Sequence, residues 1–262
     1  MVMKPALYGP VNCNMENCEK AATNYTAEVI YDHFEDNGVY ERLENNYVEG
    51  TTVAAFYSEV ENCEDNYDFA TVFYKGHSWL PWGPCYEGGS AHYHYCLVDN
   101  DGFDEEEENR IWDNWIHDKL SNRVHGFVFI WSCFNDEMGE VVNYDHAYGF
   151  PASFFNRSDL SDNGYLYWDY TDLCYIGFVN VSKNFVDTTP TDSNYGAFCR
   201  TFYDYATSGY NIFLSLYYAS YVEIGCSYAS SDLYQGYTVW HNGEPYPSRQ
   251  VVYGDGGMYL PN

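Results

Sequence analysis

The sequence predicts an α/β fold, a three-layer α/β/α sandwich with a mainly parallel central sheet. Strand-like and helix-like segments alternate along the chain, which is typical of parallel sheets with helices on both faces. Two segments, 68–74 and 126–131, are near-continuous apolar runs, as expected for strands buried on both sides. No repeat, linker or shift in composition divides the 262 residues, so we expect a single domain over 1–262.

The first half of the chain carries clear helix and strand signals. The expected elements are a short strand at 4–11, a helix at 19–38, a strand at 39–46, a helix at 53–63 and the buried strand at 68–74. Apolar residues recur at helical spacing in the first helix until Gly38 ends it. Thr51 or Thr52 can cap the second helix, because a threonine hydroxyl accepts a bond from the first helical turn.

The second half continues the alternation. The expected elements are a helix at 104–120, the buried strand at 126–131, a long loop at 134–170, a strand at 174–181, a helix at 195–222 and closing strands at 237–241 and 250–260. The helix at 104–120 begins with acidic residues, which the helix dipole favours in a first turn. Tyrosine, glycine and serine dominate the segment interpreted as a loop.

The composition is acidic and rich in aromatic residues. The formal net charge is −28, 20% of the residues are aromatic, and 46% are hydrophobic. Such acidity repels phosphate backbones, so we expect no nucleic-acid partner. The hydrophobic content excludes disorder as the reason for the charge. The acidity could instead serve to bind cationic partners or metal ions, or to keep the protein soluble at high salt, and solubility is the simplest explanation.

Several features bear on the location of the protein. No apolar run approaches the roughly 18 residues that a membrane span requires, and the first residues lack the apolar core of a signal peptide. Nine cysteines and three Asn-X-Ser/Thr sequons, at Asn24, Asn156 and Asn180, favour an extracellular or cell-surface protein with disulfide bonds. The alternative is a cytosolic chain with nine reduced thiols.

His77 and Cys133 each follow a buried strand, at its carboxyl end. Sites in open parallel sheets form at these ends, and adjacent strands lie only about 4.8 Å apart. A cysteine beside a histidine can attack an amide carbonyl and pass through a thioester. The odd number of cysteines fits this interpretation, because eight of the nine can form disulfides and leave one, at a strand end, as the nucleophile. The alternative is a core cysteine and a surface histidine that never meet.

Several segments, taken in order, resemble the caspase-like (clan CD) cysteine peptidases, which include caspases, metacaspases, legumain, clostripain and gingipains. These segments are "FEDNG-VY", Thr51-Thr52, "DFATVFYKGH", "LVDNDG", "FVFIWSC", "CYIGFVN" and "VVYGDGGMYL". In that family an apolar strand ends in the catalytic histidine, and the next ends in a small residue followed by the catalytic cysteine. The closing segment is similar to the clostripain and gingipain types. The resemblance implies a caspase-like fold and a cysteine endopeptidase.

The resemblance also implies a role for each residue at the strand ends. His77 is the general acid/base, Cys133 is the nucleophile, and the backbone amides of Ser78 and Cys133 form the oxyanion hole. Family members usually have glycine directly after the histidine, whereas this chain has Gly76 before it and Ser78 after it. Serine lacks the conformational freedom of glycine. A second hypothesis is therefore a catalytically inactive relative that serves as a surface or binding module.

Substrate preference in this family is set by a pocket around the strand after the cysteine. Asp169 and Asp172 stand just before that strand and are candidates for binding an arginine or lysine side chain. We therefore expect peptide or protein substrates with a basic P1 residue. The alternative is that both are solvated loop acids. A preference for aspartate would need a buried arginine, for which Arg157 and Arg200 are the candidates.

Two clusters suggest metal ions, although the chemistry itself needs no cofactor. The segment with Asp99, Asp101, Asp104 and Glu105 around a glycine suits a structural calcium ion, but an acidic helix-capping loop is the better explanation. His92, His94 and Cys96 alternate, so a strand would place them on one face where they could bind zinc. A Cys85–Cys96 disulfide is the simpler interpretation. A third hypothesis is a calcium- or glycan-binding domain in which the cysteine and histidine are coincidental.

Overall fold

The computed structural model describes most of the chain. The described residues are 2–3, 14–40, 43–44, 52–79, 85–87, 90–98, 110–119, 125–135, 140–143, 146–157, 172–185, 195–241 and 243–262. Within these ranges, no helix combines the length and the hydropathy that a membrane crossing needs, as the sequence predicts.

A seven-stranded sheet lies at the centre, in the order β13-β14-β12-β9-β3-β1-β2. Its strands are β1 (Val2–Met3), β2 (Leu43–Glu44), β3 (Ala70–Lys75), β9 (His125–Trp131), β12 (Cys174–Val179), β13 (Tyr237–His241) and β14 (Glu244–Gly254). The strands from β2 to β12 in this order run parallel, whereas β14 is antiparallel to β12 and to β13. The predicted α/β fold with a mainly parallel sheet is confirmed.

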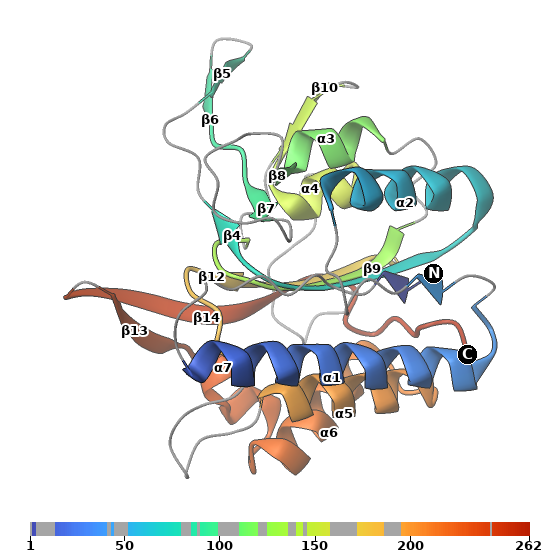
Figure 1. Ribbon diagram of the computed structural model, residues 1–262, viewed down its shortest axis with the longest axis vertical. Coiled ribbons are helices and arrows are strands. Elements are labelled where there is room, and N and C mark those ends of the chain that lie inside the picture. The colour runs from blue at the N-terminus through green and yellow to red at the C-terminus, as the bar shows by residue number, and fades with distance from the viewer. Residues whose placement is uncertain are drawn as a thin grey trace.

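Helices cover both faces of the sheet (Figure 1). One face carries α1 (Asn14–Asn37), α5 (Tyr195–Thr207) and α6 (Ile212–Glu223), and the other carries α2 (Val53–Asn66), α3 (Asp113–Asp118) and α4 (Phe150–Phe155). The 3-10 helix η3 (Tyr228–Ser230) and α7 (Asp232–Gln235) precede β13. The described residues also form three small sheets. One has three strands, in the order β4 (Ser78–Trp79), β7 (Cys96–Val98) and β8 (Arg110–Trp112). The other two are the pairs β5 (Cys85–Glu87) with β6 (Ser90–His92) and β10 (Glu140–Asn143) with β11 (His146–Tyr148).

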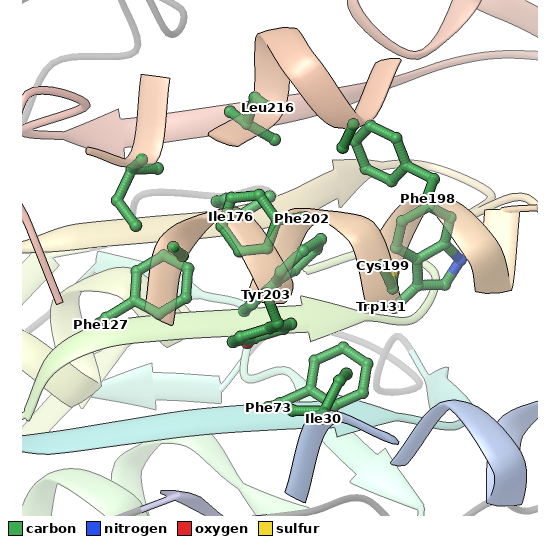
Figure 2. Packing of buried hydrophobic residues seen from close by; sticks show 14 of the residues in the cluster. Ile30, Phe73, Phe127, Trp131, Ile176, Phe198, Cys199, Phe202, Tyr203 and Leu216 are labelled. Atoms are coloured by element: carbon green, nitrogen blue, oxygen red, sulfur yellow. The ribbon is translucent and has the colours of Figure 1, made fainter. Parts of the chain in front are cut away.

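The core consists of two apolar clusters, one on each face of the sheet. On the α5 face, side chains of β3, β9 and β12 meet those of α5 and α6 (Figure 2). Aromatic rings dominate this cluster: the centroid of Tyr203 lies 5.5 Å from that of Phe73, and Phe129 lies 5.6 Å from Phe202. Every residue of β3 and β9 is buried, as the apolar runs predict. Burial of each large side chain contributes about 1.5–3 kcal/mol, so both central strands are firmly held.

Local signals account for two helix ends. The hydroxyl of Thr52 accepts a bond from the Ala55 amide at 3.2 Å, so Thr52 is the cap of α2. Gly38 follows α1 with a φ of +70°, a left-handed conformation that glycine adopts without steric cost. The first helix starts earlier than predicted, at Asn14. Val2–Met3 form a short strand, and the strand predicted at 4–11 lies outside the described residues.

The helix expected at 104–120 is wrong in its described part. Arg110–Trp112 form strand β8, and only Asp113–Asp118 are helical. Tertiary contacts hold this backbone extended: Ile111 pairs with Leu97 of β7, and the Trp112 amide donates to the Tyr57 hydroxyl at 2.7 Å. The helical spacing of apolar residues therefore did not decide the structure here. Pairing with β7 and the bond to Tyr57, which the sequence does not reveal, hold the segment extended.

Two further expectations are corrected. The segment 134–170 contains the β10–β11 hairpin and α4, whose six residues are all buried, so it is not one long loop. The helix expected at 195–222 is two helices, because Gly209 has a φ of +89° and the Asn211 side chain caps α6 by accepting from the Leu214 amide. The closing strand β14 ends at Gly254 instead of extending to 260.

Candidate active site

His77 lies just beyond the carboxyl end of β3. It is half-buried, and its carbonyl accepts a bond of 3.2 Å from the Tyr74 hydroxyl. Gly76 precedes it, and a Cβ atom there would lie 2.2 Å from the same hydroxyl. Because Tyr74 is 1% exposed and cannot move away, only glycine fits between the strand and His77. The glycine before the histidine thus has a packing reason.

Cys133 lies just beyond the carboxyl end of β9, the neighbour of β3. The two strands are parallel, and Lys75 pairs with Trp131, so His77 and Cys133 each stand two residues past one paired position. The Gly76 amide donates to the Trp131 carbonyl at 3.4 Å, which keeps the strand ends together. Adjacent strands are about 4.8 Å apart, so the structure brings both residues to one edge of the sheet.

A third strand end borders the cysteine. Ser182 follows β12, and its hydroxyl oxygen lies 3.7 Å from the Cys133 sulfur. The Tyr237 hydroxyl donates to the Val181 carbonyl at 2.7 Å, which attaches β13 to this loop. Burial raises the pKa of Tyr237, and the nearby Cys133 adds to the shift, so Tyr237 stays a neutral donor. None of these residues was expected at the site from the sequence, although Ser182 directly follows the strand predicted at 174–181.

The cations at this edge are neutralised within the chain. The Lys75 ammonium lies 3.1 Å from the Glu19 carboxylate, and the same carboxylate accepts a bond from the Phe185 amide. The Lys183 ammonium lies 3.0 Å from Asp232 and 4.4 Å from the centre of the Tyr237 ring. These pairs tie α1 to the end of β3 and to the loop after β12, and tie α7 to the same loop.

Asp172, one of the two carboxylates suggested for substrate binding, does not lie at this edge. Asp172 precedes β12, and Cys174 at the start of that strand pairs with Phe127 of β9, six residues before Cys133. At about 3.3 Å per residue, these six residues span roughly 20 Å, and Asp172, two residues before Cys174, lies at the opposite edge of the sheet from the cysteine. Asp169 lies outside the described residues. The carboxyl end of β12 is at Val179, so residues that precede Cys174 lie at the other end of the strand and cannot contact Cys133.

The two arginines considered for an aspartate-specific pocket have no described contact with His77 or Cys133. Arg200 lies on α5, where its guanidinium donates to the Thr26 hydroxyl of α1 at 2.8 Å and stacks over Tyr25. Arg157 follows α4 on the other face of the sheet. The described contacts of these two arginines therefore give no reason to expect selection of an acidic P1 residue.

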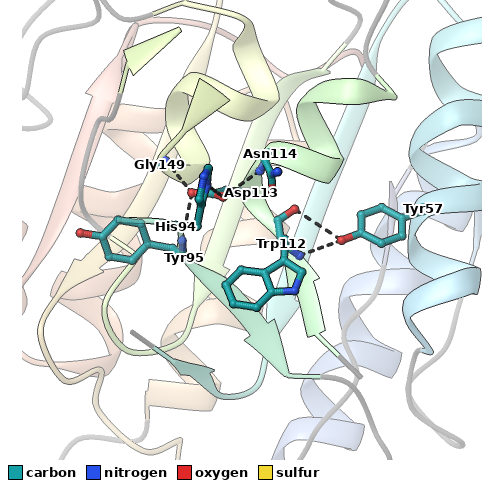
Figure 3. Close-up of polar contacts among 7 residues, drawn as sticks. All are labelled: Tyr57, His94, Tyr95, Trp112, Asp113, Asn114 and Gly149. Carbon is teal, nitrogen blue, oxygen red and sulfur yellow. Dashed lines mark hydrogen bonds and ion pairs between the residues drawn. The ribbon is translucent and has the colours of Figure 1, made fainter. Parts of the chain in front are cut away.

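The zinc prediction fails at His94. Residues 93–95 are not in a strand, so the alternation that would align the three ligands does not apply. The Nδ1 atom of His94 instead lies 2.8 Å from the buried carboxylate of Asp113, which also accepts bonds from the amides of Tyr95, Asn114 and Gly149 (Figure 3). Complete burial raises the pKa of Asp113, and the His94 hydrogen bond opposes that shift.

Metal ligands are not grouped elsewhere in the described part of the chain. No cluster of three or more histidine, cysteine, aspartate or glutamate side chains occurs there. The calcium prediction at Asp99, Asp101 and Asp104, and the side chain of His92, lie outside the described residues. The calcium site therefore stays a prediction.

The cysteine parity argument is wrong. Cys133, Cys174, Cys199 and Cys226 have free thiols, so the chain cannot pair eight of its nine cysteines. Cys174 and Cys199 are fully buried small apolar side chains of the core, and burial raises the pKa of both thiols. Cys133 is distinguished instead by its position at a strand end and its partial exposure. Cys85, once suggested as a disulfide partner, has a side chain outside the described residues.

Comparison of the chain with models of known protein families, with curated proteins and with solved structures gave no match. The class defined by the fold and the strand ends is an α/β protein with a histidine and a cysteine just beyond the carboxyl ends of two adjacent strands of a mainly parallel sheet.

Proposed function

We propose that the protein is a caspase-like cysteine endopeptidase, with Cys133 as nucleophile and His77 as general acid/base. The observation that carries the proposal is the β3–β9 register, which puts both residues two positions beyond the Lys75–Trp131 pair on adjacent parallel strands. A nucleophile and a base within reach of one substrate carbonyl are the minimum that amide hydrolysis by this route requires.

The reaction would proceed in two halves. The Cys133 thiolate attacks the scissile carbonyl carbon, and the carbonyl electrons move to oxygen to form a tetrahedral oxyanion. When the oxyanion collapses, the C–N bond breaks, His77 protonates the leaving amine, and a thioester remains. Water then attacks the thioester as His77 accepts its proton, and the thiolate leaves to restore the enzyme. Backbone amides at the strand ends, above all that of Cys133, would stabilise the oxyanion.

The acidic surface supports peptide substrates with a basic P1 residue. A net charge of −28 raises the local concentration of cationic peptides near the protein and repels acidic ones. Because Asp172 lies at the far edge of the sheet, the proposed preference for arginine or lysine rests on this long-range field and not on an identified pocket carboxylate.

The test is cleavage of a peptide-amide library by the wild type and by Cys133→Ala, His77→Ala and Cys226→Ala, each with calcium and with chelator. Cys226 is also partly exposed but lies between α6 and η3, so its variant is the matched control. We expect hydrolysis after arginine or lysine that falls at least about 1,000-fold in both strand-end variants and persists in the control. Equal turnover in Cys133→Ala would refute the proposal.

A module that binds peptides without cleaving them is the second candidate, and Ser78 favours it. This residue opens β4 and pairs with Leu97 of β7, so the second amide assigned to the oxyanion hole belongs to a small sheet. Its hydroxyl is buried and has no hydrogen-bond partner among the described residues. Slow alkylation of Cys133 near neutral pH, together with binding but no hydrolysis of library members, would support this candidate over the peptidase.

A further inference from the structure

Asn135, two residues after Cys133, connects the end of β9 to β12. Its side chain is 1% exposed and makes bonds in two directions. The Nδ2 atom donates to the Ser132 carbonyl at 2.6 Å and to the Ser132 hydroxyl at 2.9 Å. The Oδ1 atom accepts from the Phe178 amide at 2.9 Å and from the Tyr175 hydroxyl at 3.1 Å. The side-chain amide therefore bridges the turn that holds Cys133 to the next strand.

Strand β12 is shaped to admit this side chain. Gly177 lies in the middle of the strand, where a missing side chain weakens packing. A Cβ atom at Gly177 would lie 2.2 Å from Asn135 Oδ1 and 3.1 Å from the Asn135 carbonyl oxygen. The Tyr175 hydroxyl also donates to that carbonyl oxygen at 2.8 Å, so both ends of Asn135 are held.

The bond from Asn135 to the Ser132 carbonyl determines where the Cys133 amide points. A trans peptide is planar, and its C=O and N–H groups point in opposite directions. With the Ser132 oxygen held against Asn135 at 2.6 Å, the Cys133 N–H must point to the opposite side of the turn. Rotation of this one peptide plane would remove the amide from the position where a tetrahedral oxyanion forms.

The turn needs such a restraint. Phe134, between Cys133 and Asn135, has a φ of +49°, a left-handed conformation that a bulky residue adopts only when its surroundings impose it. Its amide donates to the Asn180 carbonyl, and the Asn135 amide donates to the Phe178 carbonyl at 3.2 Å. Without the Asn135 side chain, these two backbone bonds and the bond from the Tyr175 hydroxyl to the Asn135 carbonyl would remain to hold the strained turn.

We infer that Asn135 is a positioning residue that fixes the Ser132–Cys133 peptide so that the Cys133 amide can bind the oxyanion. The inference rests on the proposed peptidase function for its kinetic consequence, but the orientation of the peptide is a property of the chain alone. Tyr175 and Gly177 serve the same arrangement, one by holding Asn135 and the other by making room for it.

The test compares wild type with Asn135→Ala, Tyr175→Phe and the control Asn66→Ala, which changes an exposed asparagine at the end of α2. For Asn135→Ala we expect a kcat at least about tenfold lower with KM within about twofold, because the amide acts on the transition state. Alkylation of Cys133 by iodoacetamide, which forms no oxyanion, should change less than about threefold. Equal losses in hydrolysis and alkylation, or an unchanged kcat, would overturn the inference.

Amide hydrogen exchange provides a readout that does not need activity. The amides of Phe134 and Asn135, which donate to the carbonyls of Asn180 and Phe178, should exchange at least about tenfold faster in Asn135→Ala as the turn loosens, while amides within β9 keep their wild-type rates. Unchanged exchange at both positions contradicts the inference even if the wild type hydrolyses no peptide, which is the separate failure of the proposed function. If Asn135→Ala does not fold, Tyr175→Phe decides, with a severalfold faster exchange expected and wild-type exchange opposing the inference.

Discussion

Asp113 is a buried carboxylate that forms four hydrogen bonds, so its removal should be costly. Its Oδ1 accepts from His94 Nδ1 at 2.8 Å and from the Asn114 amide at 2.7 Å. Its Oδ2 accepts from the Tyr95 amide at 3.0 Å and from the Gly149 amide at 2.7 Å. These bonds join the segment before β7, the start of α3 and the start of α4 around a side chain that is 0% exposed.

The change Asp113→Ala leaves the amides of Tyr95 and Gly149 buried without acceptors. Each buried donor left unsatisfied costs about 1–3 kcal/mol, which gives about 2–6 kcal/mol for the two. Relief from burying a carboxylate offsets part of this, so we expect a loss of about 2–4 kcal/mol in the free energy of unfolding. Asp113→Asn keeps one acceptor oxygen and should lose less, about 1–2 kcal/mol.

Urea unfolding followed by circular dichroism measures the effect, with the midpoint lowered and the slope unchanged. The control is Asp65→Ala, which removes an exposed carboxylate near the end of α2 and should stay within about 0.5 kcal/mol of wild type. An Asp113→Ala protein as stable as that control would refute the reasoning, because it would mean that water satisfies both amides at no cost.

Three other predictions concern thiols, alkaline pH and a helix cap. In the native protein near neutral pH, alkylation followed by mass spectrometry should label Cys133 and Cys226. Cys174 and Cys199 should stay unlabelled until the protein unfolds, because burial raises the pKa of both thiols. Labelling of Cys174 in the native protein would contradict this prediction. Burial likewise raises the pKa of several tyrosines from the ordinary value of 10.0; they are Tyr40, Tyr57, Tyr203 and Tyr237. Because they ionise first in the unfolded chain, stability should be intact below pH 10 and fall as the pH rises above it, by up to about 1.4 kcal/mol per pH unit for each group. Urea midpoints across this range check the sign, and a flat profile would exclude it. Thr52→Ala should lower the free energy of unfolding by about 1 kcal/mol, because α2 loses its cap, and an unchanged urea midpoint would contradict the capping role.

The parts of the fold that were predictable are those with a strong local signal. The apolar runs that become β3 and β9 are buried along their full length, and Gly38 and Thr52 mark helix ends through their own backbone and side-chain preferences. The helix expected at 104–120 failed because Trp112 is held extended by the Tyr57 hydroxyl, a residue 55 positions away. Local periodicity contains no information about such a partner.

The candidate site divides in the same way. That His77 and Cys133 each end a buried strand is readable from the chain, but that Lys75 pairs with Trp131 is a matter of sheet register. The suggestion of Asp172 failed because a residue before a parallel strand lies at the wrong edge, and Ser182, after that strand, borders the cysteine instead. Asn135 could not be recognised, because its role depends on the bare backbone of Gly177 in another strand.

The sequence by itself determined the α/β class, the central apolar strands and the acidic surface, since these follow from composition and from the spacing of side chains along the chain. Only the tertiary structure decided which strands are neighbours, which cysteines are sealed in the core, and that Asn135 holds the peptide before Cys133. The physical reason is that secondary structure responds to residues a few positions apart, whereas strand order, burial and hydrogen-bond partners are set by the packing of segments far apart in the chain.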